Sequence, residues 1–243
     1  METLTNARIK LVKSLKDKKF RDEYGLFVVE GEKMVAEARK SGFGIEEEWR
    51  TEEVGQKAME RMTLLSSPSP VLAVVRKPDY ISSWKVPTKG LWLALDSVRD
   101  PGNLGTILRI ADWFGTDGIF ASPDTVDPFN PKVVQASMGA IFRVKFHYAD
   151  LQSLAQDILK QDGKLYGTFL DGRNIYECDL CTGKEKPSVI VMGNESEGIS
   201  PALAQYVTDR LYIPPYPRDC PGSESLNVAV ATAVTIAEFR RRD

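Results

Sequence analysis

Short apolar runs alternate with amphipathic stretches from Leu91 onward. The apolar runs predict strands at 91–96, 118–121, 143–147, 164–170, 188–193 and 210–213. The periodic stretches predict helices at about 103–114, 131–140, 150–161, 200–206 and 225–241. Strand–helix alternation is typical of a mainly parallel sheet covered by helices, so we expect an α/β fold. Residues 171–187 follow neither pattern, and we expect a long irregular connection there.

The first ninety residues have a different pattern. A helical apolar stripe runs through residues 6–21, and the β-branched run at 26–31 predicts a strand that is followed by a helix. Residues 76–90 contain two prolines and a terminal glycine without periodicity, which is typical of a linker. We therefore expect two domains, at residues 1–87 and 88–243.

Composition and charge exclude several classes of protein. Hydrophobic residues make up 42% of the chain and charged residues 27%, the balance of a globular protein. No apolar run approaches the ~20 residues that span a bilayer, and we expect no membrane contact. The N-terminus lacks the apolar segment of a secretory signal, and three cysteines cannot form a disulfide framework, so we expect a cytoplasmic protein. The net charge of −2 excludes a surface that is basic throughout.

One segment is strongly basic in spite of this balance. Residues 6–21 carry seven Lys and Arg side chains against a single Asp. Such a run is either the solvated face of an amphipathic helix or a surface that contacts phosphates, and the sequence leaves both readings open. The candidate phosphate contacts are Arg8, Lys10, Lys13 and Lys16.

Histidine and cysteine are too sparse for two common kinds of site. The only histidine, His147, ends a strand-like run without a nucleophile nearby, so a Ser-His-Asp hydrolase is disfavoured. Cys178 and Cys181 have C-x-x-C spacing and Cys220 is a possible third ligand. A structural zinc site usually needs four ligands, and we expect no metal.

The first of three candidate loops follows the strand that ends at Asp96. A Pro-Gly turn leads into a helix, and Asn103 lies near its start, where asparagine is favoured for capping alone. Arg109 lies about 200° around this helix from Ile107, so it points away from the buried stripe. An exposed arginine on a capped helix is the purely structural alternative.

The second and third loops follow later strands. Gly193 and Gly198 bracket polar residues, which allows a sharp turn in which Glu195 is either a cap or a ligand contact. The third loop follows Ile213, and a helix opens at about residues 225–227. Its free amide groups suit a polar ligand.

Taken in order, these loops resemble the motifs of the SpoU (TrmH) family of RNA ribose 2′-O-methyltransferases in the SPOUT superfamily. The matching runs are PGNLGTILR at 101–109, VMGNESEG at 191–198, and Ile213-Pro214 followed by ESLNVAVA at 224–231. The N-terminal part more loosely resembles the substrate-binding domain of such enzymes, which is similar to ribosomal protein L30e.

The resemblance implies a fold, a cofactor and partners. It implies a trefoil knot near the C-terminus, whose loops bind S-adenosyl-L-methionine with Gly193, Ile213 and Leu226 around the adenosine. It also implies a homodimer that acts on rRNA or tRNA. The loop at 215–224 is longer than is usual in the family, so we expect a different shape near the substrate.

The catalytic and substrate-contact positions of the family match Asn103, Arg109, Glu195, Ser225 and Asn227. The implied reaction is methylation of a ribose 2′-hydroxyl, for which the family proposal gives Arg109 the activating role. Arginine is a poor base, so Arg109 either sits in an altered environment or orients the hydroxyl by binding a neighbouring phosphate. No metal is needed, because a sulfonium is already an activated methyl donor.

Two other functions stay open. The chain could be a catalytically inactive RNA-binding module of the same fold, which an assay for cofactor-dependent RNA methylation would reveal. It could also be a metabolic α/β enzyme acting on a small phosphorylated substrate, and binding of unmodified RNA to the protein on a filter would argue against that.

Overall fold

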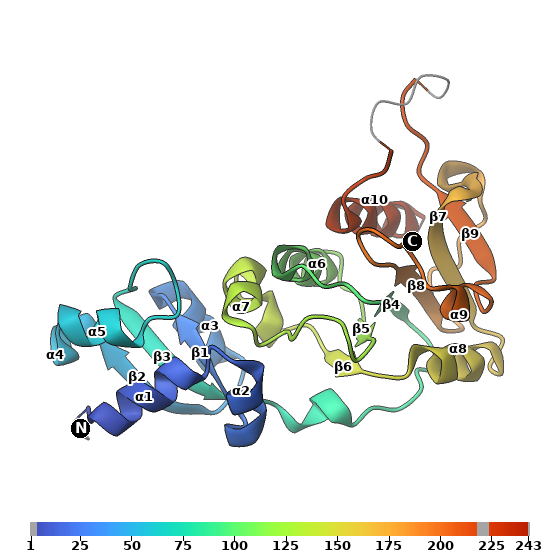
Figure 1. Cartoon of the computed structure of the whole chain (residues 1–243). Coiled ribbons are helices and arrows are strands. Elements are labelled where there is room, and N and C mark those ends of the chain that lie inside the picture. Colours follow the sequence, from blue (N-terminus) through green and yellow to red (C-terminus); the bar gives the residue numbers. More distant parts are fainter. Residues whose placement is uncertain (1–3, 218–223, 243) are drawn as a thin grey trace. The chain divides into compact units, whose positions relative to one another are not determined.

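The computed structural model describes residues 4–217 and 224–242, which fold into two compact units (Figure 1). The first unit combines residues 1–79 with 127–143, and the second combines residues 80–126 with 144–243. The chain therefore passes between the units three times, after residues 79, 126 and 143. Each unit has its own sheet.

The first unit is built on a three-stranded antiparallel sheet in the order β1-β3-β2. The strands are β1 (Leu26–Glu30), β2 (Ile45–Arg50) and β3 (Val71–Arg76). The helices are α1 (Asn6–Ser14), α2 (Lys18–Tyr24), α3 (Glu32–Lys40), α4 (Thr51–Val54), α5 (Gln56–Met62), α7 (Pro131–Ser137) and the 3-10 turn η2 (Ala140–Phe142). The apolar stripe expected at 6–21 is present, because Ile9, Val12 and Leu15 are buried. The helix breaks into α1 and α2, however, where Asp17 adopts an extended backbone.

Residues 127–143 complete the core of the first unit. The ring of Phe129 lies 4.7 Å from the ring of Phe27 in β1, measured between centroids. Oδ2 of Asp127 accepts a hydrogen bond of 2.7 Å from Nε of Arg21, and it lies 2.7 Å from Nη2 of the same guanidinium in an ion pair. Both of these charged side chains are almost fully buried. The segment is therefore fixed to α2 and β1 by aromatic packing and by a buried ion pair.

The second unit is a six-stranded parallel sheet in the order β6-β5-β4-β8-β7-β9. The strands are β4 (Leu91–Leu95), β5 (Gly118–Ala121), β6 (Phe146–Tyr148), β7 (Lys164–Asn174), β8 (Ser188–Met192) and β9 (Asp209–Tyr212). The central strands β4 and β8 are almost entirely buried, as expected for a parallel sheet that is covered on both faces. The predicted α/β fold with a mainly parallel sheet is confirmed.

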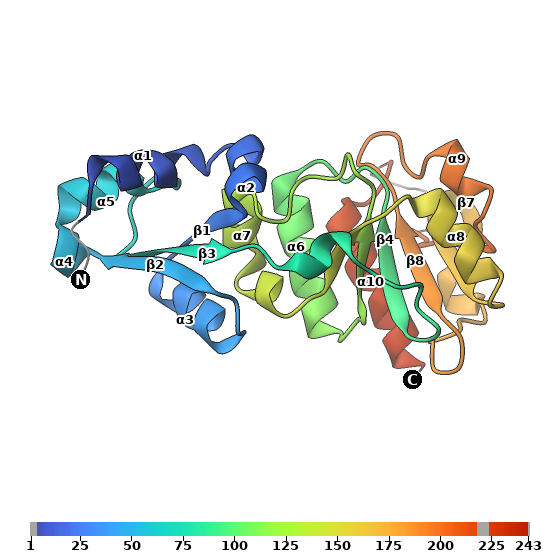
Figure 2. The same ribbon diagram turned by 90° about the horizontal axis from the view of Figure 1, so that it is seen from below.

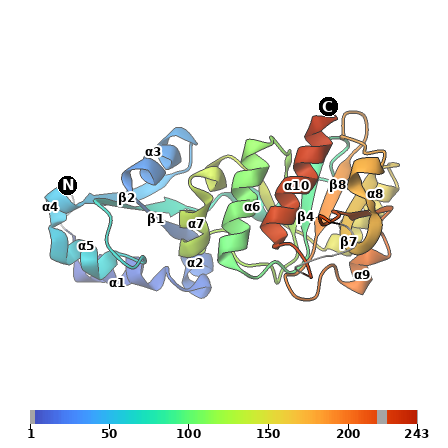
Figure 3. The ribbon, with the colours of Figure 1, turned by 90° about the horizontal axis from the view of Figure 1, so that it is seen from above.

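Helices cover both faces of this sheet. They are α6 (Pro101–Trp113), α8 (Leu151–Leu159), α9 (Pro201–Ala204) and α10 (Val228–Arg241). The 3-10 turn η3 (Ile175–Glu177) belongs to the same unit, and the 3-10 turn η1 (Asp79–Ser82) spans the boundary between the units in the sequence. Figure 2 shows α8 in front of the sheet, and Figure 3 shows α6 and α10 side by side on the opposite face. Leu154 and Ile158 of α8 pack against Phe120, Val189 and neighbouring core residues.

Two sequence predictions in this unit need correction. The strand expected at 143–147 begins only at Phe146, because residues 140–143 complete the turn η2 and its cap. The irregular connection expected at 171–187 starts later, because β7 continues to Asn174. Thr168 and Arg173 both pair with Leu211 of β9, so the residues between them form a bulge. Pairing with β9 therefore extends a strand whose own sequence shows no alternation.

The helices α6 and α10 are joined at both ends. The side-chain amide of Asn227 donates to Oδ1 of Asn103 at 2.9 Å, beside the start of each helix. At the other end, Arg240 donates to the carbonyl oxygens of Phe114 and Gly115 at 2.8 and 2.6 Å. The two helices therefore run parallel. Arg240 therefore places its positive charge at the carbonyl end of α6.

The helix α10 is only partly buried, although its residues 228–237 are all apolar or small. Ile236 and Phe239 are fully buried, but Val230 keeps 49% of its surface exposed. In the described parts of the chain, no helix is both long and apolar enough to cross a membrane.

Candidate functional site

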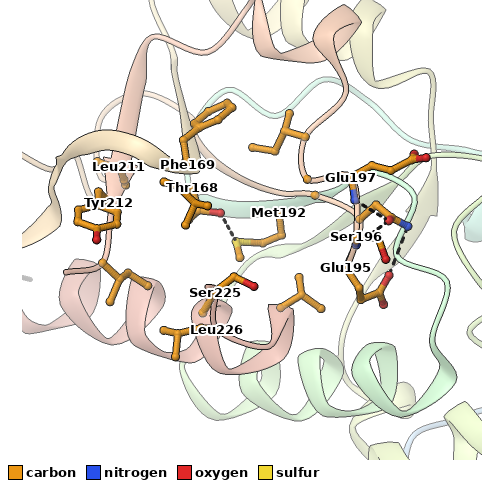
Figure 4. Close-up of a pocket in the computed structure, with 18 of the residues that line it drawn as sticks. Thr168, Phe169, Met192, Glu195, Ser196, Glu197, Leu211, Tyr212, Ser225 and Leu226 are labelled. Atoms are coloured by element: carbon orange, nitrogen blue, oxygen red, sulfur yellow. Dashed lines mark hydrogen bonds between the residues drawn. The ribbon is translucent and has the colours of Figure 1, made fainter. Parts of the chain in front are cut away.

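A pocket of about 500 Å³ lies at the carboxyl ends of the neighbouring strands β8 and β9, next to the middle of β7 and the start of α10 (Figure 4). Such edges of parallel sheets are where ligands usually bind. The walls come from four stretches: residues 168–170, 192–199, 211–213, and 224–231 without 227, 229 and 230. Loops that are far apart in the sequence therefore build a single concave surface.

The turn after β8 has the sharp shape that its glycines predict. Backbone hydrogen bonds of 2.9 and 3.0 Å join Asn194 and Gly198 in both directions. Oδ1 of Asn194 accepts from the backbone N–H groups of Ser196 and Glu197 at 2.9 and 3.1 Å. A Cβ atom at Gly193 would lie 2.1 Å from the carbonyl carbon of Gly198, so only glycine fits there. The turn is thus preorganised by its own contacts.

Glu195 of this turn reaches the loop between β4 and α6. Its Oε1 accepts from the side-chain amide of Asn103 at 2.9 Å and from the backbone N–H of Asp100 at 3.2 Å. Its Oε2 accepts from the backbone N–H of Arg99 at 3.4 Å. Burial alone would raise the pKa of Glu195, but these hydrogen bonds outweigh it and lower the pKa below its ordinary value. The carboxylate is therefore ionised and held at both oxygens.

Asn103 and Asn227 extend this contact into a row of three side chains. Asn103 donates to Glu195 and accepts from Asn227 through its other side-chain atom. Asn227 also caps α10, because its Oδ1 accepts from the backbone N–H of Ala229 at 2.9 Å. The structure thus brings together three of the five predicted catalytic residues, one from each candidate loop.

The other two predicted catalytic residues are placed differently. Ser225 lines the pocket and is exposed to solvent. Arg109 is exposed on α6, as its helical position predicts, but it does not line the pocket. Within the described parts of the chain, its guanidinium makes no hydrogen bond or ion pair and is available to a ligand.

All three predicted cofactor residues, Gly193, Ile213 and Leu226, line the pocket. The sequence interpretation missed the contribution of β7, whose Thr168 lies in the wall with its hydroxyl 3.8 Å from the sulfur of Met192 (Figure 4). The signal was available in principle. Parallel strands end at the same edge, so a predicted strand at 164–170 must deliver its last residues beside those of 188–193.

The predicted phosphate contacts all lie in or beside α1 of the first unit, where two of them have other partners. Arg8 forms an ion pair with Glu47. Nζ of Lys13 donates to the carbonyl oxygen of Thr63 at 2.8 Å. Lys10 and Lys16 are exposed, and the ammonium group of neither forms a hydrogen bond or an ion pair with a described residue. The free positive charge of the basic segment is therefore smaller than its sequence suggests.

The remaining candidate residues are ordinary parts of the structure. His147 is buried in the edge strand β6 and stacks at an angle on Phe120. Cys178 is buried and Cys181 is half-buried, whereas Cys220 lies outside the described residues. The described residues contain no group of three or more His, Cys, Asp or Glu side chains that could hold a metal ion.

Two family models match the chain. The model of the SpoU rRNA Methylase family matches residues 90–237, which include all of the pocket and the row of three side chains. The model of the MRM3-like substrate binding domain matches residues 6–77, which form most of the first unit.

Individual relatives match over nearly the whole chain. The 23S rRNA (guanosine(2553)-2′-O)-methyltransferase RlmP of Bacillus subtilis is 30% identical, over 99% of this chain and 98% of its own. A solved structure from Porphyromonas gingivalis, assigned to the TrmH family of RNA methyltransferases, is 36% identical with a TM-score of 0.88 over all of both chains. The AdoMet-bound rRNA methyltransferase of Sinorhizobium meliloti is 30% identical with a TM-score of 0.82, over 100% of this chain and 97% of that one.

Proposed function

Because this chain belongs to the SpoU rRNA methylase family, we propose that it transfers a methyl group from S-adenosyl-L-methionine to a ribose 2′-hydroxyl of ribosomal RNA. The observation that carries the proposal is the row Glu195–Asn103–Asn227, which joins the three motif loops at the edge of the pocket. We take rRNA rather than tRNA as the substrate, because the Bacillus relative is named as a 23S rRNA enzyme.

The pocket fits the cofactor in size and in chemistry. Its volume of about 500 Å³ falls within the range of ~300–1,000 Å³ that is typical of small-molecule sites. Apolar side chains such as Met192, Ile213 and Leu226 suit an adenine ring. The hydroxyls of Thr168 and Ser225 and the backbone groups of the turn at 193–198 offer partners to the ribose and amino-acid parts.

When bound, S-adenosyl-L-methionine supplies an electrophilic methyl group on a sulfonium sulfur. The protein's task is then to align the 2′-hydroxyl and to favour loss of its proton. A guanidinium is a permanent donor and cannot accept a proton at neutral pH. We therefore assign Arg109 to binding a phosphate next to the target ribose, so that the hydroxyl is oriented toward the pocket.

The row of three side chains holds the site in shape. Glu195 ties the turn of the pocket to the start of α6, and Asn227 ties the start of α10 to the same point. Ser225 lies two residues before Asn227 and lines the pocket, so its hydroxyl is available to the target ribose of the RNA. A carboxylate that is fixed at both oxygens gives preorganisation, which an enzyme needs more than a passive binding module does.

We also propose that the enzyme is a cytoplasmic homodimer whose C-terminal region is knotted. Trp113 of α6 is 86% exposed and Val230 of α10 is 49% exposed, although the two helices pack side by side. Large apolar side chains on adjacent exposed helices are common at subunit interfaces. Light scattering should give about twice the 27.1 kDa of one chain, and a mass of one chain would overturn the dimer.

The decisive experiment is to map 2′-O-methyl groups in total rRNA after incubation with the protein and labelled cofactor. We expect one strongly methylated nucleotide that depends on both. A protein that binds rRNA and cofactor but transfers no label would be an inactive binding module. A protein that binds no RNA would favour an enzyme for small phosphorylated substrates.

A further inference from the structure

Arg99 is an exposed arginine in the loop between β4 and α6, and it has no role in the proposed methyl transfer described above. Its side chain is 63% exposed. Its backbone N–H donates to Oε2 of Glu195 at 3.4 Å, and Glu195 lines the pocket. The backbone of Arg99 is therefore fixed directly behind the wall of the proposed cofactor site.

The guanidinium of Arg99 is directed by Asp124, which follows β5. Nη2 of Arg99 lies 3.4 Å from Oδ2 of Asp124. Asp124 is held in turn by the hydroxyls of Ser122 and Ser97, each at 2.6 Å. These hydrogen bonds lower the pKa of Asp124 to about 2, so it stays ionised at neutral pH. Asp124 is thus a rigid anchor that contacts one edge of the guanidinium.

The backbone beside Arg99 adopts an unusual conformation to make this arrangement. Ser97 has a φ of +62°, in the left-handed region that residues other than glycine rarely adopt. Its backbone N–H donates to the hydroxyl of Ser122 at 2.9 Å, which fixes the strained residue. Strain that the surroundings hold in place is common at functional sites.

We infer that Arg99 contacts a backbone phosphate of the RNA beside the target nucleotide. This inference rests on the proposed function. In the sheet order β5-β4-β8, the loop of Arg99 lies between Asp124 and the pocket. An RNA strand that delivers its ribose to the pocket and runs along this edge passes Arg99. Asp124 contacts only Nη2 of Arg99, so the other N–H groups of the planar guanidinium can bind a phosphate.

The local charge by itself opposes a phosphate at this position, so a phosphate contact here depends on Arg99. Three carboxylates surround Arg99: Asp100, Asp124 and Glu195. Each already accepts hydrogen bonds from the protein. A phosphate that approaches these three negative charges is repelled unless a cation faces it. Arg99 is the cation that the same loop presents.

The test is the salt dependence of binding to bulk rRNA. Arg99→Ala should weaken binding by about 10-fold and reduce the slope of log K against log salt by about 0.7–0.9, the effect of one lost phosphate contact. Arg99→Lys should recover the salt slope and only part of the affinity, because lysine keeps the positive charge but lacks the paired N–H donors of a guanidinium. Cofactor affinity should equal that of the wild type in both variants.

Lys160→Ala is the matched control. Lys160 is 72% exposed in the same unit and pairs with Asp157, so this variant removes an equal charge outside the site. Its affinity and slope should stay at the wild-type values. If Arg99→Ala behaves like Lys160→Ala, the inference is wrong even though methylation by the wild type succeeds. If the wild type binds rRNA without methylating it, the proposed function fails, but the salt slope still decides the role of Arg99. A wild type that binds no RNA overturns both the proposed function and the role of Arg99.

Discussion

The side-chain amide of Asn227 donates a 2.9 Å hydrogen bond to Oδ1 of Asn103, which lies 124 residues earlier in the chain. This bond fixes the orientation of both amides, because Asn103 must then direct its own N–H toward Glu195. Asn227 also uses its oxygen to cap α10. One residue therefore has two separable roles.

Asn227→Asp should separate the role of this residue as the cap of α10 from its role as the hydrogen-bond partner of Asn103. Aspartate keeps the cap acceptor and is favoured at a helix start, so the melting temperature should change little. It cannot donate to Asn103 and places a second carboxylate near Glu195, so single-turnover methylation should fall at least ~10-fold, about the effect of losing a hydrogen bond of ~1.5 kcal/mol. Rates within twofold of the wild type would show that the row does not support catalysis.

Arg109→Ala should leave cofactor binding intact, because Arg109 does not line the pocket. Single-turnover methylation should fall by at least ~100-fold, a typical loss for a positioned catalytic group. Calorimetry with the cofactor and rapid-quench assays measure the two effects. Thr106→Ala is the control, because Thr106 is also exposed on α6. Equal rates in both variants would make Arg109 an ordinary surface residue.

The basic segment should divide into two classes of lysine. Replacing Lys10 and Lys16 with alanine should weaken rRNA binding and lower the salt slope by up to about 2, since each is free to contact a phosphate. Lys13→Ala should mainly lower the melting temperature, because it removes the bond to the carbonyl of Thr63. A salt slope that falls only in Lys13→Ala would contradict this assignment.

The buried ion pair of Arg21 and Asp127 should be essential for the stability of the first unit. Arg21→Ala leaves a buried carboxylate without its partner and should cost about 3–5 kcal/mol of unfolding free energy. Arg39→Ala breaks a pair of which the arginine is half exposed and should cost at most about 1 kcal/mol. Hydrogen exchange of amides in β1 and β3 reports on this unit alone. Equal exchange in the two variants would rule out the proposed role of the buried pair.

Asp124 should contribute a stability that depends on pH. Its pKa is about 2 in the folded chain against an ordinary value of 3.8, so the folded state favours the ionised form. The contribution is therefore complete above about pH 4 and is lost as the pH falls toward 2. The difference in urea midpoint between the wild type and Asp124→Asn should be constant from pH 5 to 7 and shrink below pH 4. A difference that grows on acidification would contradict the sign.

Periodicity predicted the features that depend on one element at a time. The strand–helix alternation gave the parallel sheet, and the angular position of Arg109 gave its exposure. The bond between Asn103 and Asn227 could not be predicted this way, because it depends on how α6 and α10 are arranged in space. The motif resemblance placed both residues in one site without indicating that they touch.

The segment at 127–143 shows the same limit. Its periodicity correctly predicts a helix at about 131–140, observed as α7, but an apolar face does not specify which core it joins. The partner became visible only through Phe129 and Asp127, whose contacts lie on β1 and α2. The bulge in β7 is similar, because pairing with β9 creates it.

The excursion of residues 127–143 into the first unit affects how such proteins can be recombined. A gene fragment that stops at residue 79 encodes Arg21 without Asp127 and Phe27 without Phe129. A transplanted copy of this fragment would expose an apolar surface and leave the guanidinium of Arg21 without its carboxylate partner. Residues 1–79 alone therefore do not form a unit that recombination can transfer to another protein. The complete first unit is transferred only when residues 127–143, which connect β5 and β6 of the parallel sheet, are transferred with it.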